Sequence, residues 1–596
     1  MKSSKSLLII LLWLVFLPQT QAQSLVYHLA MPEPHTHYFE VTIDVKNYNK
    51  PEAIFELPVW IPGSYMVREY SRNLESVQAK GSKPLEIEKL AKNRWKVFNK
   101  DDKDFSVSYR VYANELSVRT SFLDASHAYI NGTSVFMYLV GLADKASTLI
   151  IKPHTDFKVI STSLKAEKDD IWTRAVPNYD VLADSPIEIG NHEVIEFKYK
   201  GIPHEIAMYG GGNYNAKRIA KDFEQCVDIC TSVFGENPCE SYTFIVHNVN
   251  SGGGGLEHLN SCSVMMSRFS YTNPDAYAGF MGLIIHEYFH LWNVKRLRPK
   301  ALGPFDYNQE NYTNMLWVAE GITSYYDELL NMRAGFSDVE GFIETFCNNV
   351  GTIENRFGRR VQPVTESSFD AWIKFYRPDE NSANATVSYY TYGSVLGALL
   401  DLELLAATQG EKGLDELMRM LYEETYKKRN TGYTDLEFRQ AAEKIAGKKM
   451  TDFFEKYVAG TTVPDYNRIL GYAGLTLKEQ EPSSISLGCS TDDTGGKVII
   501  KNVYKGGCGY TYGLNVNDEI LAIDGYRVTN RMGLSDLLSN KKAGDEISIL
   551  LSRASSIQTV KVKLALDINK LYYCQSLESP TTEQMKVRSR WLKSGK

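Results

Sequence analysis

Short runs of alternating apolar and polar residues fill the first third of the chain. Between residues 23 and 200 such runs include residues 38–45 and 105–112, and turn residues separate them. Alternation with a period of two places one face of a strand in a core and the other in solvent. We therefore predict an N-terminal antiparallel β-domain over residues 23–200.

The pattern becomes helical over most of residues 201–475. This region opens with one strand-like run at 241–247, and residues 396–405 and 438–445 carry the apolar stripe of packed helices. Apolar residues spaced three and four apart favour amphipathic helices. We predict one mixed domain here, mainly helical from about residue 336.

The apolar run 278–285 leads directly into the pentapeptide His286-Glu-Tyr-Phe-His290. Asn273 and Pro274 supply a capping residue and a first-turn proline, so a buried helix is predicted to start there. Positions i and i+4 share a helix face, so both imidazoles can bind one ion while Glu287 projects beside it. This spacing is typical of zinc hydrolases. It also occurs by chance in ordinary helices, where hydrogen bonds satisfy the histidines.

A catalytic zinc ion takes three protein ligands and keeps a fourth position for water, so a third donor is required. Glu320 is the preferred candidate because it lies among apolar residues with helical spacing, where an unpaired charge would be costly. Glu310, in the polar run 306–311, is the alternative ligand. A local cap or an arginine partner would also explain Glu320.

Residues 1–22 have the pattern of a cleaved signal peptide. Lys2 and Lys5 precede the apolar run 7–17, and small residues follow near Ala22. This run is too short to span a membrane, and no later apolar run reaches that length. We expect an exported protein, periplasmic or secreted, without a membrane segment after cleavage; an uncleaved anchor is the lesser alternative.

Composition narrows the function further. The chain has 596 residues, 43% hydrophobic and 23% charged, which predicts several folded domains. A net charge of −6 gives no indication of nucleic-acid binding. The eight cysteines are compatible with disulfides in an oxidising compartment. Cys226, Cys230 and Cys239 are interpreted as buried thiols or one bridge rather than as a second zinc site.

Several segments in order resemble the glycyl aminopeptidase family, gluzincin zinc metallopeptidases with a C-terminal PDZ domain. They are residues 59–70, 286–296, the Glu320 segment and 457–464. The resemblance covers nearly the whole mature chain. It implies a multidomain α+β protein with an N-terminal antiparallel β-domain, a thermolysin-like zinc catalytic domain with a helical extension over residues 201–475, and a C-terminal PDZ-like domain.

The resemblance also implies an active site. His286, His290 and Glu320 would hold one Zn²⁺ per chain, and Glu287 would act as the general base on a zinc-bound water. Peptides with a free N-terminus would be the substrates. Small N-terminal residues, glycine and then alanine, would be preferred.

Residues 252–258, Gly-Gly-Gly-Gly-Leu-Glu-His, resemble the strand that binds the substrate amine in gluzincin aminopeptidases. Glu257 would bind the α-amine, and Gly255 would allow close backbone approach to the ligand. His258 departs from the usual asparagine, so its role stays open. The alternative is a glycine-rich surface loop with a solvated glutamate.

A tyrosine that donates to the oxyanion is also implied by the family. Tyr390 fits its position best, although Tyr389 and Tyr392 remain alternatives, because Tyr392 stands where the family pattern often has lysine. Most of the 37 tyrosines in this chain are expected only to pack. Trp60 and Tyr65 are interpreted as part of such a packed cluster.

A PDZ-like domain is predicted over residues 476–570, a range that includes the linker 481–484 before the PDZ-like unit itself. Its mark is the run 513–525, and residues 486–489 resemble the loop that binds a peptide C-terminus. A purely structural appendage is equally compatible with this pattern. Residues 571–596 are expected to form a solvated C-terminal tail.

Two alternatives to the aminopeptidase remain. One is a zinc endopeptidase, in which Glu257 does not bind an amine. The other is a catalytically silent PDZ peptide-binding protein with a structural zinc; Glu287 counts against it, because a structural site needs no general base. Blocking the substrate N-terminus separates the two enzymes, since only an endopeptidase keeps the blocked substrate.

Overall fold

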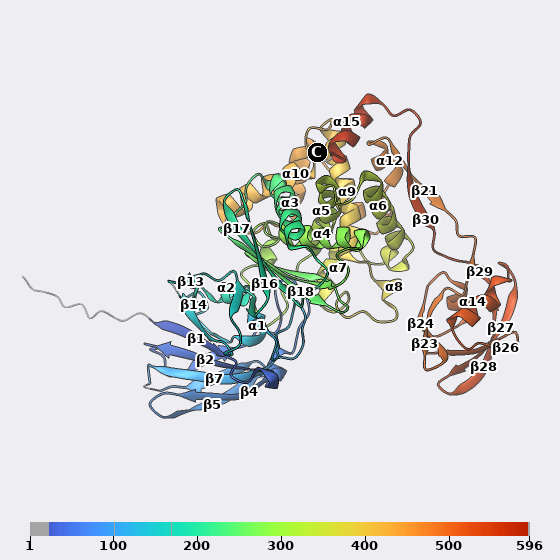
Figure 1. Ribbon diagram of the computed structural model, residues 1–596. Coiled ribbons are helices and arrows are strands. Elements are labelled where there is room, and N and C mark those ends of the chain that lie inside the picture. Colours follow the sequence, from blue (N-terminus) through green and yellow to red (C-terminus); the bar gives the residue numbers. More distant parts are fainter. Residues whose placement is uncertain (1–22, 101, 169, 594–596) are drawn as a thin grey trace, which may run out of the picture.

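The computed structural model describes residues 23–100, 102–168 and 170–593. Three regions are visible in Figure 1: a β-domain at the N-terminus, a central domain rich in helices, and a smaller β-rich domain joined by a two-stranded connection. Each region has its own hydrophobic core. The predicted multidomain α+β fold is confirmed. The predicted signal peptide, residues 1–22, lies outside the described residues.

The N-terminal domain consists of two antiparallel-rich sheets. The larger has the strand order β10-β3-β6-β5-β4-β7-β2-β1-β11-β14-β13, and the smaller has the order β12-β15-β9-β8. Burial alternates along β2 and β7, as the sequence pattern predicted, and among the described strands of this domain only β1 and β11 pair in parallel. The elements are β1 Ser24–Ala30, β2 Tyr38–Lys46, β3 Ala53–Glu56, β4 Leu74–Lys80, β5 Pro84–Ala91, β6 Arg94–Phe98, β7 Phe105–Tyr112, β8 Phe122–Leu123, β9 Ala128–Ile130, α1 Gly132–Val135, β10 Tyr138–Leu139, β11 Ser147–Lys152, β12 Val159–Thr162, β13 Ala166–Glu167, β14 Asp170–Val176, α2 Tyr179–Ala183 and β15 Ile187–Gly190.

The central domain starts with a five-stranded sheet in the order β16-β17-β18-β20-β19. Strands β17, β18 and β20 are parallel, whereas β19 pairs with β20 in the antiparallel sense and forms an edge. An antiparallel edge strand leaves one side of its backbone free for an extended peptide. The strands are β16 Glu193–Tyr199, β17 Ile202–Tyr209, β18 Tyr242–Val249, β19 Gly255–His258 and β20 Ser261–Ser267.

Helices pack around this sheet and form the rest of the central domain (Figure 1). Helix α9 is buried over most of its length, which explains the apolar stripe predicted at 396–405. None of the helices in the described part of the chain is long and apolar enough to cross a membrane. The helices are α3 Ala216–Phe234, α4 Pro274–Phe289, η4 Trp317–Ile322, α5 Thr323–Ala334, α6 Val339–Glu354, α7 Val364–Phe369, α8 Ser382–Ala385, α9 Tyr389–Ala407, α10 Leu414–Leu421, η7 Tyr422–Lys427, α11 Asp435–Ala446, η8 Phe453–Val458 and α12 Tyr466–Gly471.

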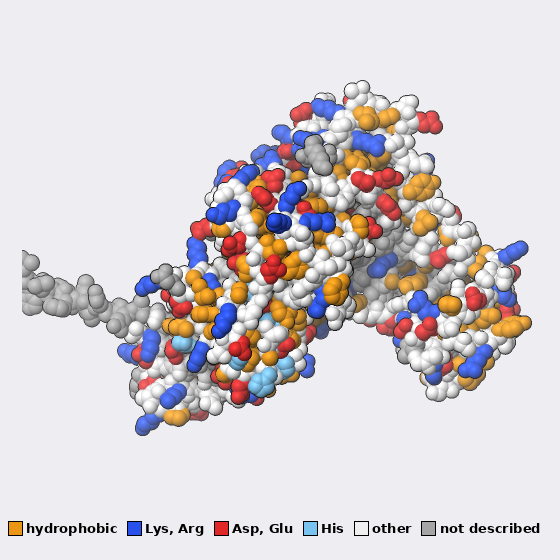
Figure 2. All heavy atoms as spheres, in the orientation of Figure 1, with side chains coloured by type: hydrophobic (Ala, Val, Ile, Leu, Met, Phe, Trp, Pro, Cys, Tyr) orange, Lys and Arg blue, Asp and Glu red, His pale blue; other side chains and the backbone are white. Residues whose placement is uncertain are grey.

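The C-terminal β-rich domain holds a six-stranded sheet with the path β23-β24-β25-β27-β28, in which β26 pairs with β25, and a two-stranded sheet of β22 and β29. Figure 2 shows it as a separate lobe beside the main body. A cavity of about 730 Å³ lies where the lobe meets the central domain. The elements are β22 Ile485–Ser486, β23 Cys489–Thr494, β24 Lys497–Val503, α13 Cys508–Tyr512, β25 Glu519–Ile523, β26 Tyr526–Arg527, α14 Arg531–Ser539, β27 Glu546–Arg553, β28 Ser556–Lys563 and β29 Ala565–Leu566.

The last segment returns to the central domain, which differs from the expected solvated tail. Strand β30 (Leu571–Ser576) pairs with β21 (Leu475–Gln480), and helix α15 (Thr582–Trp591) packs against α9. Trp591 is fully buried, and its indole nitrogen donates to the hydroxyl of Tyr325 at 2.9 Å. The basic residues of this segment suggested solvation, but one buried tryptophan decides its place.

Candidate active site

Helix α4 presents both histidines of the motif to the interior. Its start is fixed as predicted, because the Asn273 side chain accepts a hydrogen bond from the backbone N–H of Ala276 and Pro274 occupies the first turn. The helix ends at Phe289, so His290 is its C-terminal cap. His286 therefore lies on the last turn and His290 directly beyond it.

Glu320 faces both histidines from the wide helical turn η4. Its Oε2 lies 3.6 Å from Nε2 of His286 and 3.3 Å from Nε2 of His290. Metal bonds to nitrogen and oxygen are about 2.0–2.1 Å, so two ligands of one tetrahedral zinc lie about 3.3–3.5 Å apart. The three predicted ligands thus have the spacing of a zinc site. Glu310, the alternative ligand, is not in any group of potential ligands found among the described residues.

The other ring nitrogen of each histidine has a partner that orients the ring. Nδ1 of His286 lies 2.7 Å from Oδ2 of Asp327, and Nδ1 of His290 lies 2.6 Å from the backbone oxygen of Asn293. Such contacts hold the proton on Nδ1 and leave Nε2 free as a ligand. Asp327 was not predicted. Its position seven residues after Glu320, two helical turns on, was the available signal.

Three buried carboxylates converge on this point with unsatisfied oxygens. Oε1 of Glu320, Oε2 of Glu287 and Oε1 of Glu257 have no hydrogen-bond partner. Buried charges without partners are costly unless a cation or a donor compensates them. Zinc at Glu320 and a substrate amine at Glu257 would satisfy two of them, so these donors fit the metal that the sequence predicts.

Glu287 lies beside the candidate metal site and against strand β19. A Cβ atom at Gly255 would collide with the Glu287 carboxylate, so this position requires glycine. Burial raises the pKa of Glu287 to about 7, although His286 and His290 oppose the shift. A carboxylate with this environment can take up and release a proton near neutral pH.

Glu257 is buried on the same strand, β19, and forms a group of potential ligand atoms with Glu287 and His290. The alternative to the predicted amine-binding role, a surface loop with a solvated glutamate, is therefore wrong for this residue. The Lys295 ammonium lies 4.0 Å from the Glu257 carboxylate and 3.0 Å from Asp184, which holds it on the far side. His258 also contacts Asp184, at 2.9 Å, and this contact anchors the end of β19.

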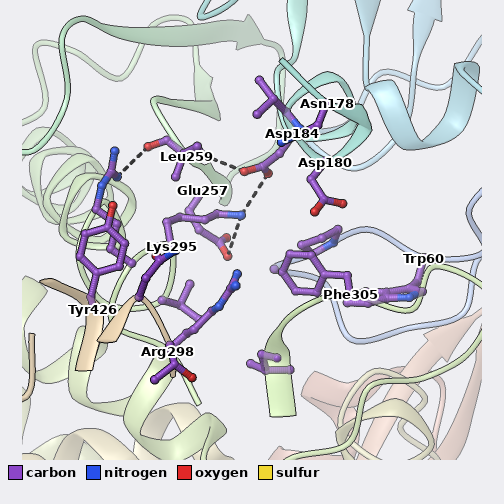
Figure 3. A pocket seen from close by; sticks show the side chains of 18 of the residues that line it. Trp60, Asn178, Asp180, Asp184, Glu257, Leu259, Lys295, Arg298, Phe305 and Tyr426 are labelled. Atoms are coloured by element: carbon purple, nitrogen blue, oxygen red, sulfur yellow. Dashed lines mark hydrogen bonds and ion pairs between the residues drawn. The ribbon is translucent and has the colours of Figure 1, made fainter. Parts of the chain in front are cut away.

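A cavity of about 370 Å³ opens beside Glu257 (Figure 3). Trp60 and Phe305 form an aromatic side of it, while Lys295 and Arg298 point toward Glu257 from the other side. The cavity combines apolar walls with a few charged groups, as ligand sites commonly do. Glu257 therefore lies at the junction of the candidate metal site and a cavity.

A loop of the N-terminal domain closes this side of the site, which the sequence analysis did not predict. Gly63 has φ +90°, and a Cβ atom there would collide with the Glu257 carboxylate. Tyr65 is buried against Trp372. Burial raises the pKa of its hydroxyl well above the usual value, and the negative charges of Glu320 and Glu257 add to this effect. Trp60 and Tyr65 pack in an aromatic cluster as expected, but this cluster borders the site.

Helix α9 brings the tyrosine candidates to the metal site. Gly321 of η4 and Gly393 of α9 lie so close that neither could carry a Cβ atom, and this contact places the first turn of α9 beside Glu320. The ring of Tyr390 stacks over His286 with 6.4 Å between ring centres. The Tyr392 hydroxyl instead donates to the backbone oxygen of Tyr457 at 3.1 Å and is not available.

A second group of two histidines and one glutamate lies elsewhere, between the N-terminal domain and the central sheet. Glu188 of β15 contacts His127 at 2.7 Å and His247 of β18 at 2.9 Å, and all three are fully buried. These are hydrogen-bond distances, shorter than the spacing of two zinc ligands. Nε2 of His127 and Nδ1 of His247 have no orienting partner. This group fits a buried hydrogen-bonded contact between the two domains better than a metal site.

Three family models match the chain. Residues 26–191 match the peptidase M61 N-terminal domain, residues 279–396 match the M61 glycyl aminopeptidase, and residues 485–564 match a PDZ domain. The second range includes the candidate metal ligands and Tyr390.

Two solved structures are similar to this chain. An aminopeptidase N family protein from Idiomarina loihiensis is 29% identical with a TM-score of 0.88, over 95% of this chain and 100% of that chain. An M1 zinc metallopeptidase from Deinococcus radiodurans is 13% identical with a TM-score of 0.46, over 74% of this chain and 94% of that chain. No curated protein matched this chain.

Two histidines and a glutamate around one point, in a chain with these domains, define a zinc metallopeptidase. More specifically, the chain belongs to the M61 glycyl aminopeptidase family, with the M61 N-terminal domain and a C-terminal PDZ domain. Its family class is that of a metallo-aminopeptidase. The family predicted from the sequence is confirmed.

Proposed function

We propose that this protein is an exported aminopeptidase that binds one zinc ion per chain and removes small N-terminal residues from peptides. The observation that carries the proposal is the buried carboxylate of Glu257, which has an unpartnered oxygen beside the candidate metal site. A peptide N-terminus would donate the hydrogen bond that this oxygen lacks, since Lys295 stays 4.0 Å away and is held by Asp184. Export rests on the predicted signal peptide.

His286, His290 and Glu320 are the proposed zinc ligands. When bound, zinc supplies a Lewis acid that polarises the scissile carbonyl and lowers the pKa of a water ligand. Asp327 and the Asn293 carbonyl keep both Nε2 atoms directed at Glu320. This pre-set orientation avoids a rearrangement when the metal binds.

Glu257 binds the substrate α-amine, and Glu287 moves the proton. The partnerless Oε2 of Glu287 accepts a proton from the attacking water and delivers it to the leaving amine. The missing side chain at Gly255 permits a substrate backbone to run along β19 close to Glu287. Glu257 fixes where this backbone begins, so only the first peptide bond reaches the proton acceptor.

Tyr390 is the proposed oxyanion donor. Burial raises the pKa of its hydroxyl well above the usual value, so the group keeps its proton and can donate it in a hydrogen bond. Donors of this kind contribute about 2.7–4 kcal/mol to transition-state stabilisation in other enzymes. Tyr389 is packed more deeply against Phe375 and stacks on Tyr390.

The preference for glycine and alanine is supported by crowding on the N-terminal side of the substrate. Gly63 approaches Glu257 so closely that it excludes any side chain of its own, and Tyr65 and Tyr376 pack together nearby. On the side of Gly63 and Tyr65, a bulky first side chain would have to displace these groups.

The PDZ domain is proposed to bind peptide C-termini in its groove.

Hydrolysis of glycyl and N-acetylglycyl chromogenic amides tests the proposal, with wild-type and Glu257→Gln protein. We expect zinc-dependent cleavage of the free-amine substrate only, and a 10- to 100-fold lower kcat/KM for Glu257→Gln, corresponding to about 1.5–3 kcal/mol for a charge-assisted contact. Glu310→Gln is the matched control. Equal cleavage of both amides would indicate an endopeptidase instead.

A further inference from the structure

Two cysteines far apart in the sequence meet at the base of the PDZ domain. The sulfur of Cys347, on α6, lies 3.3 Å from the sulfur of Cys574, on β30, although 227 residues separate them along the chain. Cys347 is buried and Cys574 is half-buried. Sulfurs in this position need only a small movement to reach the bond length of about 2.0 Å in a disulfide.

Both cysteines lie on elements whose relative position is fixed. The Asn355 side chain, at the end of α6, donates to the backbone oxygen of Lys570 and accepts from its N–H, both at 2.9 Å. Tyr572 packs on Gly351 of the same helix. Strand β30 is in turn paired with β21 along its length. Contacts on both sides of the two cysteines therefore fix the short distance between their sulfurs.

Other cysteines have their sulfurs against different groups. The Cys226 sulfur lies 4.0 Å from the sulfur of Met281, and the Cys230 sulfur lies 3.7 Å from the backbone oxygen of Ile285. Both belong to the central core on α3. Of the two interpretations left open for Cys226, Cys230 and Cys239, buried thiols or one bridge, the structure has buried free thiols. These residues serve as internal controls for any oxidation at the β30 interface.

We propose that Cys347 and Cys574 form a disulfide that fastens the base of the PDZ domain to the central domain. A dithiol–disulfide oxidant, RSSR, first reacts with the more exposed Cys574 to give a mixed disulfide and one RSH. The Cys347 thiol then attacks the Cys574 sulfur and releases the second RSH. Two cysteine thiols lose two electrons and two protons, and the oxidant takes up both.

The surroundings allow such an oxidant to approach. Cys347 lines the cavity of about 730 Å³ between the PDZ domain and the central domain, together with Asn355, Asn502 and Tyr572. The proposed export would place the pair in an oxidising compartment, where disulfides persist. The inference itself does not depend on the zinc site or on export, because the pair is defined by geometry alone.

The bond would have a mechanical consequence. Strands β21 and β30 are the two connections between the central domain and the PDZ domain (Figure 1). Helix α6, which carries Cys347, packs against α9, the helix of Tyr390. A closed loop of this length also restricts the unfolded chain strongly, which stabilises the folded state. Oxidation would thus fix the PDZ attachment and raise the unfolding temperature.

The test uses the full-length protein, first reduced and then equilibrated with glutathione disulfide under native conditions. Free thiols are alkylated, and peptides are mapped by mass spectrometry without reduction. We expect one linked species joining the Cys347 and Cys574 peptides, lighter by two hydrogen atoms than the separate peptides. The oxidised chain should run faster on a denaturing gel and unfold several degrees higher than the reduced chain.

Variants distinguish this bond from other oxidation. Cys347→Ser and Cys574→Ser should each abolish the gel shift and the thermal shift, whereas Cys226→Ser should keep both. If both thiols of the wild-type protein remain fully alkylated after oxidation, or if the linked peptides contain other cysteines, the proposal is wrong. The wild-type peptide map decides this even if a variant folds poorly.

Discussion

Two clusters of two histidines and one glutamate lie in this molecule, and they differ in what surrounds the same donors. In the first, Glu320 is 3.3 and 3.6 Å from two imidazole nitrogens. In the second, Glu188 is 2.7 and 2.9 Å from its histidines. Residue types and burial are similar in both. The spacing separates ligands held apart around a point from groups that already satisfy one another.

The neighbours of the two clusters point the same way. Around Glu320, each histidine is oriented by a second contact, and further carboxylates have unpartnered oxygens. Around Glu188, Tyr209 stacks on His127 with 3.5 Å between ring centres, and Tyr129 packs edge-on against His247. The second cluster joins residues of two domains in a buried, aromatic setting. The Glu320 cluster therefore has the features of a candidate metal site, and the Glu188 cluster has those of a contact that stabilises the fold.

The largest expected effect comes from removing one glutamate of each cluster. Glu320→Gln should abolish stoichiometric zinc and peptidase activity, because a neutral amide is a poor ligand and leaves the histidines alone. Glu188→Gln should keep one zinc per chain. Metal analysis of both folded variants after dialysis checks this, and zinc loss in the Glu188 variant would erase the distinction between the clusters.

The second effect concerns Glu287, the proposed proton acceptor, which lies beside the first cluster. Glu287→Gln should retain zinc and lower kcat by about 10²–10⁴-fold, the usual contribution of a positioned acid–base group. Stopped assays with matched zinc content measure this. Unchanged turnover in the zinc-loaded variant would remove Glu287 from its proposed role.

A smaller effect is expected from the orienting contact of His286. Asp327→Asn should weaken zinc affinity by about 10–100-fold while leaving a bound site at high zinc concentration. Competition with a chelator of known affinity gives the ratio of dissociation constants. Asp338→Asn is a suitable control, since Asp338 caps α6 away from the site. An affinity equal to that of the wild type would show that the contact is only structural.

A substitution in the second cluster should have the smallest effect on the metal site. Its effect on the free energy of unfolding should be clear. Burial opposes ionisation of Glu188, but the charges and hydrogen bonds of His127 and His247 lower its pKa to about 2. Because the folded pKa lies below the ordinary value of 4.5, this stabilisation is fully present above pH 4.5. It is lost progressively as the pH falls from 4.5 toward 2.

Glu188→Gln should therefore reduce the unfolding free energy near neutral pH by about 3–5 kcal/mol, as for a broken buried pair. The difference from wild type should shrink below pH 4.5. Denaturant unfolding of both proteins with zinc removed, from pH 7 to pH 3, measures this. A difference that does not change with pH would mean that ionisation of Glu188 is not what stabilises the cluster.

The residues of the first cluster could be predicted from the sequence, because local motifs and the family resemblance both indicate them. The pentapeptide and its helix start are encoded within about five helical turns, at Asn273 through His290. Glu320 was found because a lone acid among apolar residues needs an explanation. Asp327 was missed, although it lies on the same helical face as Glu320.

The second cluster and the loop that carries Gly63 could not be predicted from the sequence, for a physical reason. Glu188 and His247 lie on β15 and β18 and His127 directly precedes β9, so their meeting depends on sheet register across two domains. The contact of Gly63 with Glu257 likewise joins residues nearly two hundred positions apart. No periodicity encodes such pairings. Trp591 was missed because a single buried residue in a basic segment leaves no pattern.

The most direct test of the account is a crystal structure of the zinc-loaded protein with anomalous scattering recorded above and below the zinc edge. We expect one peak, within bonding distance of His286, His290 and Glu320. A peak at Glu188, with or without the first, would contradict the claim that spacing and orienting contacts distinguish the two clusters. A crystal of the zinc-loaded protein with no peak at Glu320 would contradict the proposed active site.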